Sequence, residues 1–225
     1  MNQNTLISNN IRSSVPPHFG VPDVDLIMRG DASRLRRYRL ALILYLASVV
    51  MLFVGFSSAY IVRRSIATWE LGTGAYAANW EALNLPVGLL VFNTVWLLLA
   101  SVCLEVARRY NGAGSDRKTD RFTHRWILAS LFCGLVFTAG QIMAWHVLRV
   151  GGSFLSSGAA TAFFYVFTGT HFFHAVLGIF SVAFLSIGFR ALSQSSRLLG
   201  IDLAAWYMHA MAALWIYLFC FLLWA

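Results

Sequence analysis

The stretch LALILYLASVVMLFVGFSSAYIV, residues 40–62, decides the fold, because it runs for 23 residues without a single charge. An α-helix rises about 1.5 Å per residue, so a run of this length matches the hydrocarbon core of a bilayer, which is about 30 Å thick. The run lacks the alternation of apolar and polar residues that a membrane barrel strand requires. It therefore predicts a transmembrane helix.

The rest of the chain has the same character. Of its 225 residues, 59% are hydrophobic and 12% are charged, whereas a soluble domain carries about 25% charged residues. That balance excludes an ordinary soluble enzyme, a disordered chain and a small disulfide scaffold. Four further stretches carry no charge: residues 82–104, 126–148, 150–189 and 203–225.

The fourth charge-free stretch is long, but the glycine and serine residues between 151 and 158 predict a turn, which leaves one helix. We therefore expect an all-α integral membrane bundle of five transmembrane helices. The expected spans are about 40–62, 82–107, 126–148, 159–189 and 203–225. Residues 1–38 contain Pro16, Pro17 and Pro22 and are expected to form an extended N-terminal arm. The first apolar run is too long for the core of a signal peptide, so we expect an anchor rather than a cleaved leader.

Arginine and lysine set the expected orientation, because they gather on the inner side of a membrane. Only three, Arg63, Arg64 and Arg149, fall on one side of the predicted spans. The other side holds Arg12, Arg29, Arg34, Arg36, Arg37, Arg39, Arg108, Arg109, Arg117, Lys118, Arg121, Arg125, Arg190 and Arg197. The N-terminus is thus expected inside and the C-terminus outside. The net charge of +8 is attributed to inner-side contacts with anionic lipid, and no nucleic-acid partner is expected.

Polar side chains are costly within a bilayer, so the few inside the spans carry the functional information. His171 and His174 are three residues apart on one helical face, and His209 lies in the last span, so the three imidazoles could converge. One interpretation is a metal or haem site. The commoner use of such side chains is hydrogen bonding between helices. Gln141 also needs a partner inside the bundle, and Trp206 lies near the inner interface. We predict a structural, interhelical role for these five residues, with no catalytic residue and no metal ligand.

Three blocks of sequence resemble subunit III of the haem-copper respiratory oxidases. Residues 168–174, TGTHFFH, with Gly178 after them, resemble the family's helix with paired H-x-x-H histidines. Residues 204–209, AAWYMH, with Trp215 further on, resemble its last helix, A-A-W-Y-W-H-F-x-D-x-x-W. Phe137, Gln141 and Trp145 match its F-x-x-x-Q-x-x-E-[YW] helix. The resemblance covers roughly residues 40–225 and favours the five-helix bacterial form.

Three positions depart from the family pattern. Ala144 and Ala212 stand where the motifs have carboxylates, and Val49 stands where many members have an intramembrane glutamate. Roles that need those acids, such as proton buffering, are therefore in question here. The scaffold role is unaffected, since the histidine pair and the small packing residues remain.

The resemblance implies an accessory subunit of an aerobic terminal oxidase of the cytochrome c oxidase type, in the bacterial inner membrane. It implies that the chain has no cofactor of its own, that haem and copper belong to partner subunits, and that subunit I is the main contact. It also implies that the chain stabilises proton uptake and structural phospholipids, with Arg190, His171 and His174 as candidate lipid-binding residues. Two alternatives stay open. One is an accessory subunit of a nitric oxide reductase or quinol oxidase of the same family, and the other is a haem-binding membrane electron carrier.

Overall fold

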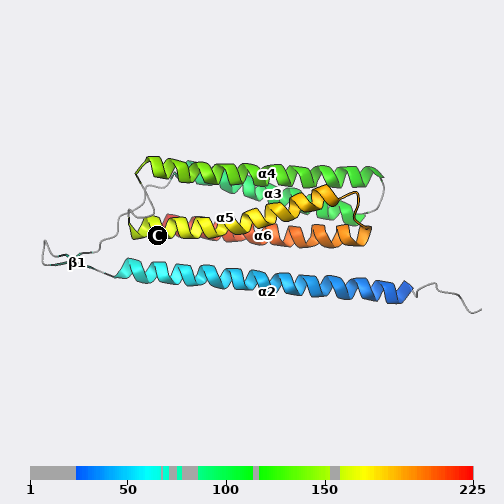
Figure 1. Cartoon of the computed structure of the whole chain (residues 1–225), viewed down its shortest axis with the longest axis horizontal. Helices are drawn as coiled ribbons and strands as arrows, with labels where there is room; N and C mark the ends of the chain where they lie inside the picture. Colours follow the sequence, from blue (N-terminus) through cyan, green and yellow to red (C-terminus); the bar gives the residue numbers. More distant parts are fainter. Residues whose placement is uncertain are drawn as a thin grey trace, which may run out of the picture. The chain divides into compact units, whose positions relative to one another are not determined.

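The computed structural model describes residues 24–66, 68–70, 75–77, 86–113, 117–152 and 158–224. The chain divides into two units, Met1–Tyr38 and Arg39–Ala225, and the second unit holds the helical bundle. The elements are α2 (Val24–Ser65), β1 (Thr68–Glu70), β2 (Ala75–Ala77), α3 (Val87–Ala113), α4 (Arg117–Val150), α5 (Ala159–Gly188) and α6 (Gln194–Trp224) (Figure 1).

Five helices in the described part of the chain are long and apolar enough to cross a membrane, which confirms the predicted all-α bundle. One small element was not predicted: β1 and β2 form an antiparallel hairpin in the connection between α2 and α3. Each strand has only three residues, too few for an alternating pattern to stand out in the sequence.

The helix ends differ from the ends of the apolar runs. α2 includes residues 24–38, which we had expected to be extended, and α4 and α6 begin at Arg117 and Gln194 rather than at 126 and 203. An apolar run marks the hydrocarbon thickness, whereas a helix continues into the polar region until a capping or breaking residue stops it. Ser193 is such a residue, because its hydroxyl oxygen accepts the Ser196 N–H at 3.3 Å just before α6.

Proline sets the start of α3. The helix begins at Val87 rather than at 82, directly after Pro86, whose carbonyl accepts the N–H groups of Leu89 and Leu90 at 3.0 and 3.1 Å. Proline is favoured at a helix start because its missing N–H has no intrahelical partner there. Residues 82–85, which the expected span included, lie outside the described residues.

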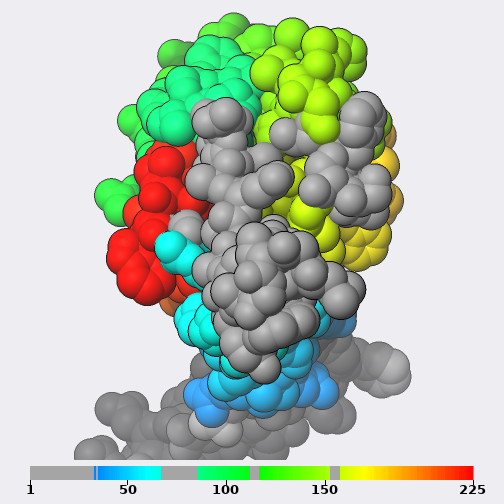
Figure 2. All heavy atoms as spheres, turned by 90° about the vertical axis from the view of Figure 1, so that its left-hand side faces the viewer, coloured from blue at the N-terminus to red at the C-terminus, as the bar shows by residue number. Residues whose placement is uncertain are grey.

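Helices α3 to α6 lie side by side (Figure 1), and the end-on view of Figure 2 shows the last turns of α6 in red beside α3 in green. Small side chains let α3 and α4 approach closely: Ala100 and Ala107 on α3 are fully buried. Across this contact the Ser130 hydroxyl of α4 donates to the Ala100 carbonyl at 2.8 Å. Small residues at helix interfaces are the usual means of close packing within membranes.

Aromatic side chains attach the bundle part of α2 to α5 and α6. The Tyr60 ring centroid lies 5.4 Å from that of Phe163 on α5 and 5.2 Å from that of Phe221 on α6, both edge to face. A hydroxyl–hydroxyl hydrogen bond of 2.8 Å joins Ser57 of α2 to Tyr217 of α6. α2 therefore contacts the bundle through long side chains, and this contact forms a second apolar cluster beside the main core.

Gly178 fixes the approach of α5 to α6. A Cβ at this position would lie 2.7 Å from Cε1 of Tyr207 and 3.1 Å from Sδ of Met208. The Tyr207 ring is held in place because its hydroxyl donates to the His174 carbonyl at 2.7 Å. An added methyl group must therefore displace a ring that is already anchored.

We predict that Gly178→Ala lowers the stability of the folded chain by about 1–3 kcal/mol, the usual cost of overpacking a core. The matched control is Gly55→Ala, because a Cβ on Gly55 meets no atom within 4 Å. The control should be neutral or slightly stabilising, since alanine is favoured over glycine in a helix by about 0.5–1 kcal/mol. Thermal unfolding in detergent micelles measures both. Equal midpoints for the two variants would contradict the close α5–α6 contact.

Candidate functional site

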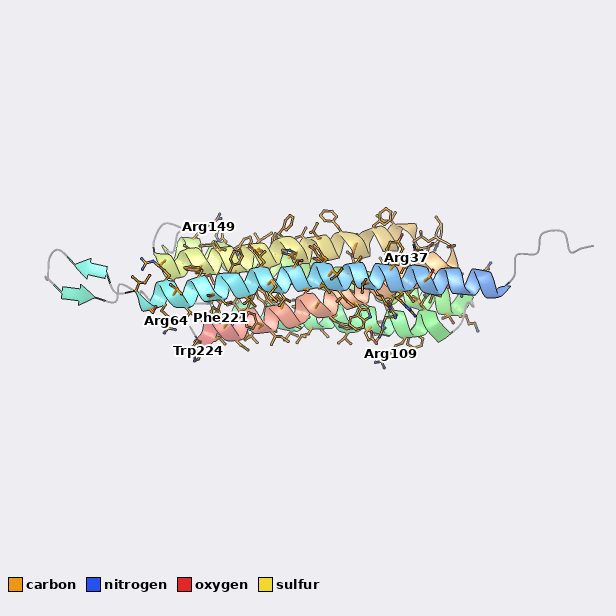
Figure 3. The ribbon with its side chains drawn as sticks, turned by 90° about the horizontal axis from the view of Figure 1, so that it is seen from below. Arg37, Arg64, Arg109, Arg149, Phe221 and Trp224 are labelled. Atoms are coloured by element: carbon orange, nitrogen blue, oxygen red, sulfur yellow. The ribbon has the colours of Figure 1, made fainter. Side chains whose placement is uncertain are left out.

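The two ends of the bundle differ in their charged residues. Figure 3 shows Arg64, Arg149 and Trp224 at one end, while Arg109 lies towards the other. We call the latter the Arg109 end: α3 and α5 finish there, and α4 and α6 begin there. It is the end that the arginine distribution predicts to be the inner one.

A carboxylate at the Arg109 end joins three helices. Asp202 of α6 accepts two hydrogen bonds from Arg39 of α2, Nε to Oδ2 at 2.7 Å and Nη2 to Oδ1 at 2.9 Å. Arg108 of α3 donates to the same Oδ1 at 3.3 Å. The Asp202 side chain is 10% exposed, whereas that of Arg39 is 44% exposed. Bidentate guanidinium–carboxylate pairs fix geometry as well as charge, so Asp202 holds α2, α3 and α6 in register.

Glu105 extends this ion-pair network along α3. Its two oxygens accept bonds from Arg108 at 2.7 and 2.8 Å and from Arg109 at 2.9 Å. His209 of α6 lies 3.4 Å from Glu105 through Nε2, and its Nδ1 is hydrogen-bonded to the Ser101 hydroxyl. With Nε2–H donating to the carboxylate, Nδ1 accepts from serine. His209 thus links α6 to α3.

The sequence carries a signal for this network. Glu105 and Asp202 both stand within a few residues of the end of an apolar run that lies towards the Arg109 end, and so do Arg39 and Arg108. Opposite charges at equal depth on different helices are expected to pair, because a lone charge near hydrocarbon is costly. Depth alone cannot say which acid meets which base, and the structure supplies that assignment.

His171 lies in the interior, where α4, α5 and α6 meet. The side chain is fully buried, and its ring centroid lies 5.0 Å from that of Trp215 and 6.1 Å from that of Phe137. Neither ring nitrogen has a hydrogen-bond partner within the described residues. Trp215 in turn donates its Nε1–H to Thr94 of α3 at 2.9 Å. The His171 ring is therefore part of an aromatic cluster, with tilted and edge-to-face contacts, that touches all four helices of the main core.

His174 faces a different neighbour. Its Nδ1–H donates to the Thr170 carbonyl one turn earlier at 2.7 Å, and its ring packs 6.3 Å from the rings of Phe53 and Tyr45 on α2. The three histidines therefore contact different groups instead of converging on one point. In the part of the chain that the structure describes, no three histidine, cysteine or acidic side chains are arranged to hold a metal ion.

Gln141 of α4 is fully buried and pairs with Asn93 of α3, whose Nδ2 donates to Oε1 of Gln141 at 3.3 Å. Gly140 makes this possible, because a Cβ there would collide with the Asn93 amide. Asn93 was not singled out from the sequence. An asparagine inside an apolar run, opposite a glycine, was the available signal.

Trp206 and Arg190 lie on the outside. The Trp206 side chain is 50% exposed, and the tryptophan that enters the helix interface is Trp215, later on the same helix. Arg190 is exposed in the turn after α5, where the Gly188 carbonyl accepts the N–H groups of Ala191 and Leu192.

The positions that lack the family's acids are all internal. Val49 is 4% exposed, Ala144 is fully buried and Ala212 is 4% exposed. Each therefore fills apolar core where a carboxylate would have needed a partner. Substitution by small or branched apolar residues keeps the packing without that requirement.

Comparison of the sequence with models of known protein families identifies the family of this chain. The chain matches the family model of cytochrome c oxidase subunit III over residues 30–225. The chain belongs to the cytochrome c oxidase subunit III family. It is accordingly an accessory subunit of an aerobic oxidase, and part of an oxidase complex.

Individual relatives agree with this family. The chain is 29% identical over 189 residues to cytochrome c oxidase subunit 3 of Petromyzon marinus, covering 83% of this chain and 69% of the relative. It is 29% identical over 181 residues to the "Probable cytochrome c oxidase subunit 3" of Nocardia farcinica, covering 79% and 82%. With cytochrome c oxidase subunit 3 of Synechocystis sp. the identity is 24% over 231 residues, covering 96% and 84%.

We predict that Asp202→Asn destabilises the chain by about 1–2 kcal/mol, because two arginines lose a charged acceptor while Arg39 keeps part of its solvation. Arg109→Gln is the control, since the Arg109 side chain is 77% exposed and its ion pair with Glu105 lies on one helix. The control should cost no more than about 0.5 kcal/mol. Thermal unfolding and limited trypsin cleavage at Arg39 report the effect. An Asp202→Asn chain as stable and as resistant to trypsin as the control would contradict the three-helix link.

Proposed function

We propose that this subunit braces the catalytic subunit I of its oxidase and holds phospholipid beside it in the bacterial inner membrane, without a redox centre of its own. Haem, copper and oxygen reduction then belong to the partner subunits. In this proposal the chain keeps proton uptake stable by fixing the shape of the complex, and it does not itself conduct protons.

The observation that carries the proposal is that several polar side chains bond to other helices of the same chain. Asp202, Glu105 and Gln141 are each bonded to another helix of the same chain, and His209 links α6 to α3. Groups engaged in this way stabilise a fixed shape. The outward faces are largely apolar, with Phe180, Phe184 and Ile187 of α5 at 67%, 75% and 86% exposure. Such faces suit lipid or the apolar surface of a membrane partner.

Arg190 is the best-placed of the three candidate lipid-binding residues. It is exposed at the Arg109 end, where a guanidinium can bind a lipid phosphate through two hydrogen bonds. His171 is fully buried and His174 is 8% exposed. The two histidines would act on lipid indirectly, by fixing the helix that carries Arg190.

A mild-detergent pull-down of the tagged chain tests the accessory role. We expect the haem-containing core subunits to co-purify, and the chain separated from them to show no Soret band. Recovery of a nitric oxide reductase core instead would show that the chain is an accessory subunit of that enzyme and contradict the oxidase role. A Soret band in the separated chain that disappears on His171→Ala would contradict the proposal and support the electron-carrier alternative.

Lipid analysis of the purified complex tests the role of Arg190. We expect Arg190→Ala to lower the number of phospholipids retained per haem and to hasten inactivation during turnover, with little change in the initial rate. The control is Arg64→Ala, an exposed arginine at the opposite end of the bundle. An unchanged lipid count in the Arg190 variant would remove Arg190 as the lipid contact.

A further inference from the structure

A strongly basic cavity opens at the Arg109 end between α4, α5 and α6. Its volume is about 910 Å³, and five arginines line it with a single carboxylate among the described residues. These residues are Arg117, Asp120, Arg121, Arg125, Arg190 and Arg197. They come from the first turns of α4, the turn after α5 and the first turn of α6.

The one carboxylate in the cavity is already engaged. Asp120 pairs with Arg197, Oδ1 to Nη1 at 3.1 Å, and the Arg197 guanidinium lies 4.9 Å above the Phe189 ring. Arg197 is thereby fixed, with its side chain 12% exposed and its Nε buried without a partner in the described structure. His124, also in the lining, donates its Nε2–H to the Ser186 carbonyl at 3.2 Å, so its ring is held in place and adds no negative charge to the cavity.

Four arginines are left without an ion pair among the described residues: Arg117, Arg121, Arg125 and Arg190. Guanidinium groups held around one cavity repel one another, and a bound anion relieves that repulsion. A guanidinium fork fits the oxygens of a phosphate through two parallel hydrogen bonds, which a chloride ion cannot use. The excess of positive charge suits a ligand with more than one negative charge.

We propose that this cavity is a binding site for a phosphate-bearing anion of at least two negative charges. Arg121 and Arg125 are its main ligands on α4, and Arg197, fixed by Asp120, forms the opposite wall. Arg190 is shared with the proposed lipid contact, so the inference deepens that part of the proposed function. The test therefore uses the α4 arginines, so that the two proposals can fail separately.

Two sources offer this chemistry. The apolar run of α4 begins directly after Arg125. Arg121 lies about one helical turn before Arg125, and Arg117 lies about two turns before it. Both are therefore expected in the water and headgroup layer. A soluble polyphosphate can reach that layer, and so can the headgroup of an anionic lipid. An apolar groove of about 540 Å³ adjoins the cavity at Leu192, which lines both, and its walls include Leu177, Phe184 and Leu203. That groove would take an acyl chain.

The experiment compares the purified oxidase complex with the same complex carrying Arg121→Gln and Arg125→Gln. Lys118→Gln is the matched control, because Lys118 is exposed on the same turns of α4 but does not line the cavity. One arm titrates the delipidated complex with inorganic triphosphate at constant ionic strength, by calorimetry. The other arm counts retained anionic phospholipid by mass spectrometry.

We expect the double variant to bind triphosphate at least tenfold more weakly than the control, or to lose one retained anionic lipid, while the control matches the unmodified complex. Loss of triphosphate binding with lipid retained identifies a soluble ligand. If the double variant loses lipid and none of the three complexes binds triphosphate, the ligand is a lipid headgroup. Equal triphosphate affinity and equal lipid count in the double variant and the control overturn the proposal. Neither arm depends on the Arg190 result or on which core subunit co-purifies.

Discussion

The Asp202 carboxylate is the contact on which the arrangement of this bundle depends. It accepts hydrogen bonds from α2 and α3 while belonging to α6, and its side chain is 10% exposed. A charge at that depth is tolerated only when it is paired, because hydrocarbon offers it no solvation. Asp202 therefore requires Arg39 and Arg108 beside it, and this requirement fixes how α2 meets the rest. Glu105 and His209 then follow along α3 and α6 as the continuation of one network.

The same requirement explains where the chain departs from its family. A bundle has a limited number of interior places at which a charge can be paired, and here they are concentrated at the Arg109 end. Val49, Ala144 and Ala212, which stand where the resembled family motifs have acids, lie in the core as apolar residues that need no polar partner. Apolar residues at these positions leave an interior of edge-to-face and tilted aromatic contacts with one amide pair, Asn93–Gln141. Such an interior suits an accessory subunit that holds its shape during turnover.

The number and type of the helices could be predicted from the charge-free runs, because lipid thickness sets their length and lipid polarity forbids exposed backbone. The interhelical use of His209 and Gln141 was also predictable, since a buried polar group needs a partner. Their partners were not. Ser101, Glu105 and Asn93 face them only because of the rotation and offset between helices, and a single sequence does not encode these in a local pattern. Helix ends were missed for a simpler reason: α4 and α6 continue beyond the hydrocarbon limit that the apolar runs mark.

The basic cavity also combines a part that the sequence shows with a part that only the fold shows. Its arginines were visible in the sequence and were assigned to orientation, because charge counting gives a side of the membrane but no position around the bundle axis. The fold adds that five of them, separated by up to 80 residues, surround one space. No local pattern in the sequence indicates this cluster, since its members come from α4, from the turn after α5 and from α6.

The central claim is that this chain braces an oxidase without taking part in electron transfer, and catalytic lifetime tests it most directly. Oxygen consumption would be followed over many turnovers for the oxidase purified with the chain and for the same oxidase from cells lacking it. The account predicts equal initial rates per haem and a clearly shorter active lifetime without the chain. A clearly lower initial rate per haem in the oxidase without the chain, or equal active lifetimes of the two preparations, would contradict it.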